Sequence, residues 1–110
     1  AAGLRWDLDM SRPRGSRLAN VEIKSRADGA WQALEPAASY TVVTSDFLAM
    51  GGDGYSTLAQ IHLAGGSVNT YLNYTQTFVD YLLAQGRVSR PAAADYSHKT
   101  VISRAGRQLP

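Results

Sequence analysis

Tyr40–Tyr55, YTVVTSDFLAMGGDGY, is the stretch on which the interpretation of this chain depends. It begins with aromatic and β-branched residues, which predict a strand over Tyr40–Thr44, the strongest strand signal in the sequence. Phe47 follows, and a glycine-rich turn then carries one carboxylate, Asp53. A strand ending here would display Phe47 where a rigid scaffold commonly presents its binding groups.

Two interpretations of this stretch are open. In the first, the Phe47 ring stacks on a nucleobase and Asp53 accepts hydrogen bonds from neighbouring hydroxyls, such as a ribose diol. Gly51, Gly52 and Gly54 would then shape the loop, because glycine permits positive φ and close approach of the backbone. In the second, Phe47 is a core residue and the glycines form only a turn. Composition alone favours the second interpretation.

The flanking sequence predicts short strands and one helix. Apolar residues alternate with charged ones from Leu4 to Asp9, the period of a half-buried strand. We expect further strands over Leu18–Lys24, Trp31–Leu34 and Thr100–Ile102. The fold class is therefore α+β, with mixed or antiparallel strands.

The helix is expected over Thr75–Gln85, where apolar side chains form a single stripe. Asn73 or Thr75 could cap its start, and Gly86 stands where a left-handed C-cap belongs. Ser56–Tyr74 gives only a weak signal, so we expect a loop with short ordered pieces there. Residues 75–85 thus form the one main helix of the predicted domain.

Composition limits the possible function classes. The 110 residues suffice for one domain, and 45% hydrophobic with 18% charged residues is typical of a soluble globular chain. The absence of cysteine excludes disulfides, thiolate zinc sites and thiol nucleophiles. No apolar run approaches the roughly 18–20 residues that span a bilayer, so no membrane span is expected.

The charged and titratable residues give no sign of catalysis. Arg12, Arg14 and Arg17 form a basic cluster without interleaved aromatics, which favours a solvated turn over a nucleic-acid polymer site. His62 is expected to be a structural histidine and His98 a solvent-exposed one. Asp7 and Asp9 share a strand face, and we interpret them as polar surface opposite the apolar face. No catalytic residue and no metal ligand are therefore expected in this chain.

A family resemblance changes the balance between the two interpretations. Asp46–Tyr55, DFLAMGGDGY, closely resembles the signature of the C-terminal domain of metal-dependent 5′-nucleotidases and UDP-sugar hydrolases. The resemblance extends over about residues 3–88. Its other pieces, in matching order, are Gly3–Trp6, Ser11–Arg17, Leu34–Pro36 before Tyr40–Thr44, and Phe78–Leu82 with Gly86–Val88.

The resemblance implies specific roles. In that family the phenylalanine of the motif stacks on the base and its aspartate contacts the nucleoside, which assigns substrate binding to Phe47 and Asp53. Gly51, Gly52 and Gly54 then shape the loop. An N-terminal calcineurin-like domain holds two divalent metal ions and hydrolyses nucleotides to nucleosides and phosphate. Such enzymes are periplasmic or extracellular.

The match also implies what this chain lacks. Residues 1–110 resemble the later half of the C-terminal domain, without the catalytic domain, so the chain alone is expected to be inactive. Apolar surface should be uncovered at Trp6, Trp31 and Phe78. Two alternatives stay open: a lid domain of a related metallohydrolase acting on other esters, and a stand-alone interaction domain without catalysis.

Overall fold

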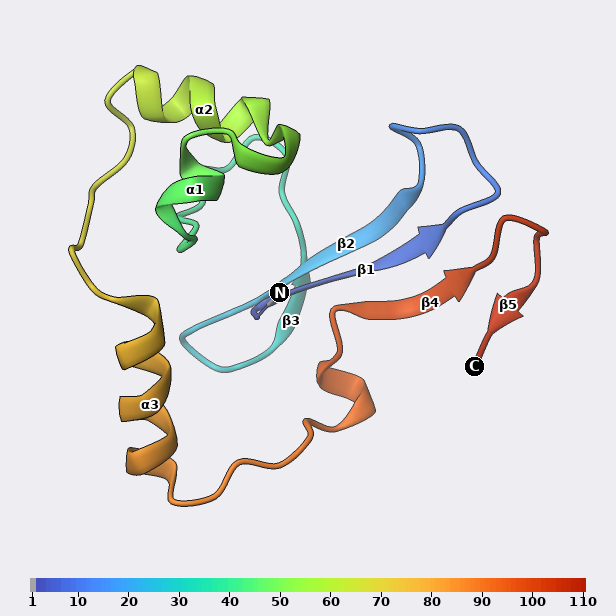
Figure 1. Ribbon diagram of the computed structural model, residues 1–110. Helices are drawn as coiled ribbons and strands as arrows, with labels where there is room; N and C mark the ends of the chain where they lie inside the picture. The colour runs from blue at the N-terminus through green and yellow to red at the C-terminus, as the bar shows by residue number, and fades with distance from the viewer. Residues whose placement is uncertain (1) are drawn as a thin grey trace. The chain divides into compact units, whose positions relative to one another are not determined.

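The computed structural model describes residues 2–110, which divide into two compact units (Figure 1). One unit contains the residues up to Ala38 together with Arg90–Pro110. The other is Ser39–Ser89. Strands occupy the first unit and α-helices the second, which confirms the α+β class.

The first unit is a five-stranded mixed sheet (Figure 1). The strands follow the order β3-β2-β1-β4-β5, in which β1 and β4 are parallel and all other neighbours are antiparallel. Their bounds are β1 Leu4–Asp9, β2 Leu18–Lys24, β3 Trp31–Ala33, β4 His98–Ile102 and β5 Gln108–Leu109. The predictions of the first four strands are confirmed, whereas β5 had no counterpart among them.

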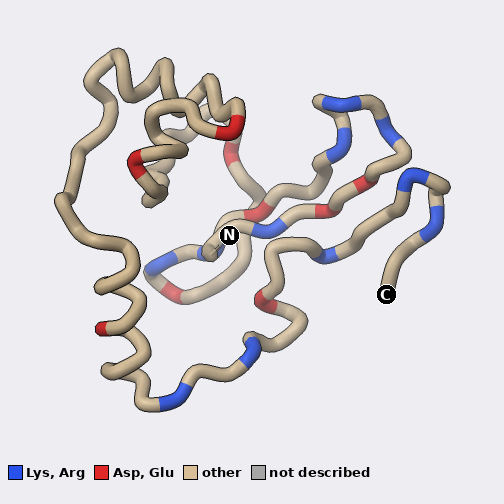
Figure 2. Tube along the Cα trace, viewed as in Figure 1, with Lys and Arg blue, Asp and Glu red and all other residues tan. Residues whose placement is uncertain are grey.

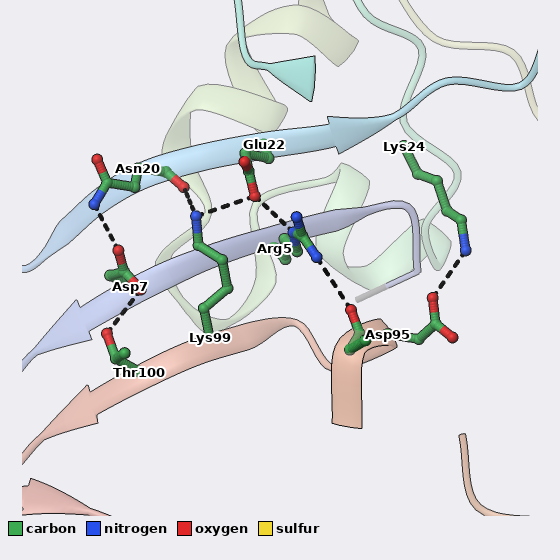
Figure 3. A network of polar contacts seen from close by, with 9 residues as sticks. Arg5, Asp7, Asn20, Glu22, Lys24, Asp95, Lys99 and Thr100 are labelled. Carbon is green, nitrogen blue, oxygen red and sulfur yellow. Dashed lines mark hydrogen bonds and ion pairs between the residues drawn. The ribbon is translucent and has the colours of Figure 1, made fainter. Parts of the chain in front are cut away.

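One face of this sheet carries a connected set of polar side chains, which we call the sheet network: Arg5, Asp7, Asn20, Glu22, Lys99 and Thr100 (Figure 3). Glu22 Oε2 accepts from Arg5 Nε at 2.6 Å and from Lys99 Nζ at 3.0 Å. Asp7 accepts from Asn20 Nδ2 at 2.6 Å and from Thr100 Oγ1 at 2.7 Å. These contacts join β2, β1 and β4, the three central strands.

Trp31 lies at one end of the sheet beside two cations. The Arg5 guanidinium is 4.3 Å from its ring centroid and Lys24 Nζ is 5.4 Å away. Lys24 also pairs with Asp95 at 2.9 Å, on the short 3₁₀ turn η2, Ala93–Asp95. The segment before β4 therefore includes an ordered turn that contacts the sheet. Trp31 is half-buried rather than uncovered because these groups cover part of it, and Trp6 is half-buried as well.

The second unit contains helices α1 Asp46–Ala49, α2 Ser56–Leu63 and α3 Tyr74–Gln85, with the 3₁₀ turn η1 Gly52–Gly54 between α1 and α2. The prediction of α3 is confirmed. Asn73 Oδ1 accepts from the backbone N–H of Thr75 at 2.9 Å and of Gln76 at 3.1 Å, so Asn73 is the N-cap. The helix ends at Gly86, whose φ is +66°.

Two expectations for this unit are wrong. Tyr40–Thr44 forms no strand, because no neighbouring strand pairs with it among the described residues and β-propensity alone does not make a ladder. Residues 56–63 form the eight-residue helix α2, where a loop with short ordered pieces was expected. Ser56 and Thr57 are modest helix formers, which weakened the signal, while contacts with α1 stabilise the helix.

No side chain among residues 2–110 is fully buried. The apolar stripe of α3 is open, with Phe78 59% and Leu83 76% exposed. The expectation of an uncovered Phe78 is therefore confirmed. Of the described helices, none has the length and apolar character to cross a bilayer.

Candidate functional site

Helix α1 presents Phe47 to solvent. Ser45 Oγ accepts a hydrogen bond from the backbone N–H of Leu48 at 3.4 Å and so caps the helix. Asp46 occupies the first turn, where a carboxylate is favoured by the helix dipole. Phe47 thus lies on a short helix rather than at the end of a strand, and its side chain is 55% exposed.

One face of the Phe47 ring is covered by the backbone of Gly52. A β-carbon placed on Gly52 would lie 2.5 Å from both Cε1 and Cζ of Phe47, which is far inside van der Waals contact. The ring therefore packs directly on the glycine, in the space where another residue would carry its side chain. Since the side chain is still half exposed, the ring has one covered face and one open face.

Gly51 brings α1 and α2 together. Its φ is +96°, which glycine adopts readily, and a β-carbon there would lie 2.8 Å from Cβ of Ala59 on α2. The loop is closed by a hydrogen bond from the N–H of Tyr55 to the carbonyl of Gly52 at 3.2 Å. We call Gly51–Gly54 the GGDG loop. Its first two glycines are required by two different close contacts.

Asp53 is the exposed carboxylate of the GGDG loop. Its backbone is left-handed, with φ +54° and ψ +22°, a conformation that aspartate tolerates better than most residues. Among residues 2–110 it is the one carboxylate side chain that makes no hydrogen bond or ion pair. Its acceptor sites are therefore available to a ligand.

The family model of the 5′-nucleotidase C-terminal domain matches residues 1–60, which include Phe47 and the whole GGDG loop. The chain belongs to the 5′-nucleotidase C-terminal domain family. A probable 5′-nucleotidase of Treponema pallidum (strain Nichols) is 31% identical over 84 residues, and an NAD 5′-nucleotidase of Haemophilus influenzae is 27% identical over 84 residues.

A solved structure supports the same assignment for this 5′-nucleotidase C-terminal domain chain. The 5′-nucleotidase precursor of Thermus thermophilus matches it with a TM-score of 0.75 and 35% identity, over 88% of this chain and 18% of that one. The two curated relatives match over 76% and 74% of this chain, which spans 14% of the length of each.

The other candidate residues are occupied by internal contacts. Asp7 lies in the sheet network, and Asp9 accepts from Ser11 Oγ at 2.6 Å and Arg12 Nε at 3.1 Å. His62 is exposed, and its Nδ1 lies 2.6 Å from Ser67 Oγ. His98 is exposed, as expected, and its ring centroid is 5.6 Å from that of Tyr96.

The hydrogen bonds lower the pKa of several of these carboxyls. The Asn20 amide, followed by the Thr100 hydroxyl, lowers the pKa of Asp7. The Arg5 guanidinium, followed by Lys99, lowers the pKa of Glu22. The lowered pKa favours the ionised form of both carboxyls, in which they accept the hydrogen bonds of the sheet network.

The donor set of the described residues does not fit the two metal ions that the family resemblance implies for the parent enzyme. Nowhere in residues 2–110 do three or more His, Asp or Glu side chains gather as metal ligands would. Asp53 belongs to no such group. No metal-assisted step is therefore derived from these residues.

Sequence motifs pointed to Phe47, Asp53 and the glycines, and the structure brings Phe47 onto Gly52, the residue next to Asp53. What the sequence interpretation missed is that Phe47 lies in the first turn of a helix. The signal was present in Ser45 and Asp46, a capping residue followed by a first-turn acid.

Proposed function

We propose that this chain recognises the nucleoside part of a nucleotide, with Phe47 stacking on the base and Asp53 accepting hydrogen bonds from sugar hydroxyls. The observation that carries the proposal is a half-exposed aromatic ring packed on Gly52, the residue that precedes the only unpartnered carboxylate side chain of the described residues. Stacking and charge-assisted hydrogen bonds are the two interactions that a nucleoside needs.

The charge distribution of the helical unit supports the nucleoside rather than the phosphate as the group bound here. The helical unit contains three aspartates and one arginine, Arg87, which lies beyond the end of α3, and residues 39–86 contain no lysine or arginine (Figure 2). A phosphate would find no cation on this segment, whereas an uncharged base and sugar meet no repulsion. Phosphate binding would thus belong to other parts of the parent protein.

The proposal for the parent protein follows from family membership and from the names of the relatives. We propose that the parent protein is a 5′-nucleotidase that hydrolyses nucleoside phosphates to nucleoside and phosphate and acts outside the cytoplasm. Residues 1–110 are the later half of its C-terminal, substrate-binding domain. A separate N-terminal catalytic domain would hold the two divalent metal ions, which activate water for attack on the phosphate. The chain alone is then inactive.

Adenosine titration of the 110-residue chain, followed by NMR, tests this proposal. We expect the amide signals of Phe47–Tyr55 to shift at millimolar adenosine. Replacing Phe47 with alanine should weaken binding by about 5- to 150-fold, since stacking contributes about 1–3 kcal/mol. Phe78→Ala is the matched control, because Phe78 on α3 is similarly exposed at 59% against 55% for Phe47.

Two results would contradict nucleoside recognition. The GGDG loop signals could stay unmoved at saturating adenosine, or both phenylalanine variants could lose affinity equally. The second outcome would indicate general hydrophobic association. Comparing adenosine with free ribose 5-phosphate separates base stacking from sugar or phosphate contacts, because only the former requires a planar ring.

A further inference from the structure

We propose that Gly52 is a positioning residue of the nucleoside site: its missing side chain forms the seat of the Phe47 ring and leaves that ring a single face for a base. This inference rests on the proposed function of Phe47. It assigns Gly52 a role distinct from those of the other glycines of the loop.

The contacts of the three glycines separate their roles. Gly51 and Gly54 have positive φ, +96° and +81°, so their backbone conformations by themselves favour glycine. Gly52 has no positive φ, and an alanine could adopt its backbone conformation. What excludes a side chain at Gly52 is the Phe47 ring, with Cε1 and Cζ at 2.5 Å and Cδ1 at 2.7 Å from the β-carbon position.

All three of the nearest atoms belong to the same aromatic ring and are nearly equally distant, so the β-carbon position of Gly52 lies over the face of that ring. A side chain at this position would displace the ring, because real β-carbons do not approach other atoms below 3.0 Å. Asp53 is the next residue in the sequence. Gly52 therefore fixes the position of the Phe47 ring relative to the residue that carries the free carboxylate.

A ring that is seated on one face can stack with only one ligand ring, on its other face. The site thus takes one planar base on this side, and its sugar is placed toward the GGDG loop. Shifting the ring by the few tenths of an ångström or more that a β-carbon requires would misalign base and sugar contacts together.

The experiment is a double-mutant cycle on the 110-residue chain, with adenosine as the probe. Gly52→Ala should weaken binding about fivefold or more, toward the value of Phe47→Ala. Phe47→Ala combined with Gly52→Ala should bind no more weakly than Phe47→Ala alone, because without the ring the seat has no role. Phe47→Leu combined with Gly52→Ala should regain part of the apolar contact.

Gly66→Ala is the matched control. Gly66 also lacks a positive φ, and a β-carbon there would meet Cγ2 of Ile61 at 2.8 Å, outside the GGDG loop. Its replacement should leave adenosine affinity unchanged. Additive losses in the cycle, or wild-type affinity of Gly52→Ala alongside a weakened Phe47→Ala, would overturn the role of Gly52.

A ligand-free measurement keeps this test separate from the proposed function. The α-protons of Gly52 should show upfield ring-current shifts that vanish in Phe47→Leu. If Phe47→Ala binds adenosine normally, nucleoside stacking fails whatever Gly52 does. If the ring-current shifts are absent, the seat itself does not exist and the inference fails even where Phe47 binds the base.

Discussion

The sheet network and the GGDG loop both carry carboxylates, but they treat them in opposite ways. Asp7 and Glu22 each accept two side-chain hydrogen bonds and hold three strands together. Asp53, in a left-handed backbone conformation, makes no internal contact of this kind within residues 2–110. A carboxylate whose acceptors are already used stabilises the fold, whereas one left free on a shaped loop is available to a ligand.

Replacing Asp53 with asparagine gives the largest expected difference between the two regions. Asparagine tolerates the left-handed conformation, so the loop keeps its shape while the charge is lost. Hydrogen bonds to a charged group contribute about 1.5–3 kcal/mol, which predicts a loss of adenosine affinity of about 10- to 150-fold. Calorimetric titration measures it, and the unfolding temperature should not fall. An unchanged affinity would show that Asp53 does not contact the ligand.

Replacing Gly51 with alanine should destabilise the GGDG loop without altering the groups proposed to contact the ligand. The left-handed conformation costs a non-glycine residue about 1–2 kcal/mol, and the added methyl meets Ala59. We expect the helical signal of the α1–α2 pair in circular dichroism to decrease, and the pair to unfold at a lower denaturant concentration. Gly54→Ala, which meets no atom within 4 Å, is the control for backbone strain alone. Equal effects of both changes would remove any special role of the Ala59 contact.

Asp7→Asn tests whether the sheet network contributes to stability and not to binding. It keeps the shape of the carboxyl but removes its charge, so the contacts with Asn20 and Thr100 lose their charge-assisted strength. The unfolding temperature should fall. The drop should be smaller than in Gly51→Ala, because the carboxyl of Asp7 is partly exposed to water. Adenosine affinity should stay at the wild-type value. A binding defect here would contradict the division of roles.

The smallest expected effect is the pH dependence of the sheet. Folding lowers the pKa of Asp7 and the pKa of Glu22 from their ordinary values of 3.8 and 4.5. The folded state therefore binds fewer protons, and the stabilisation is fully present above those values. It is lost as the pH falls from about 4.5 through the lowered pKa values. Melting curves of wild type and of the double variant Asp7→Asn, Glu22→Gln should converge at acidic pH; parallel curves would contradict this.

Most of the sheet and one helix could be predicted from the sequence because their signals are local. The alternation in β1 and the apolar stripe with Asn73 and Gly86 in α3 depend only on neighbouring residues. The strand predicted over Tyr40–Thr44 does not form, because a strand needs a paired neighbour and pairing depends on the whole fold rather than on five residues. Helix α1, at four residues, is too short to show a periodicity.

The candidate site could be predicted in its residues but not in its geometry. The motif around Phe47 and Asp53 singled out both positions, and the family model and the solved relative establish the family. The contact between Phe47 and Gly52 could not be inferred from the motif, because it depends on how α1 turns back over the loop. Nor could the free state of Asp53, which follows from the contacts that every other carboxylate side chain makes.

The β-forming run before α1 has a consequence for handling the chain in solution. Residues 39–45, SYTVVTS, contain no charge, proline or glycine, and Val43 is 94% exposed. Such a segment can add as a strand to an identical segment of another copy, in the manner of cross-β assembly. We therefore expect these residues to promote fibril formation when the chain is concentrated.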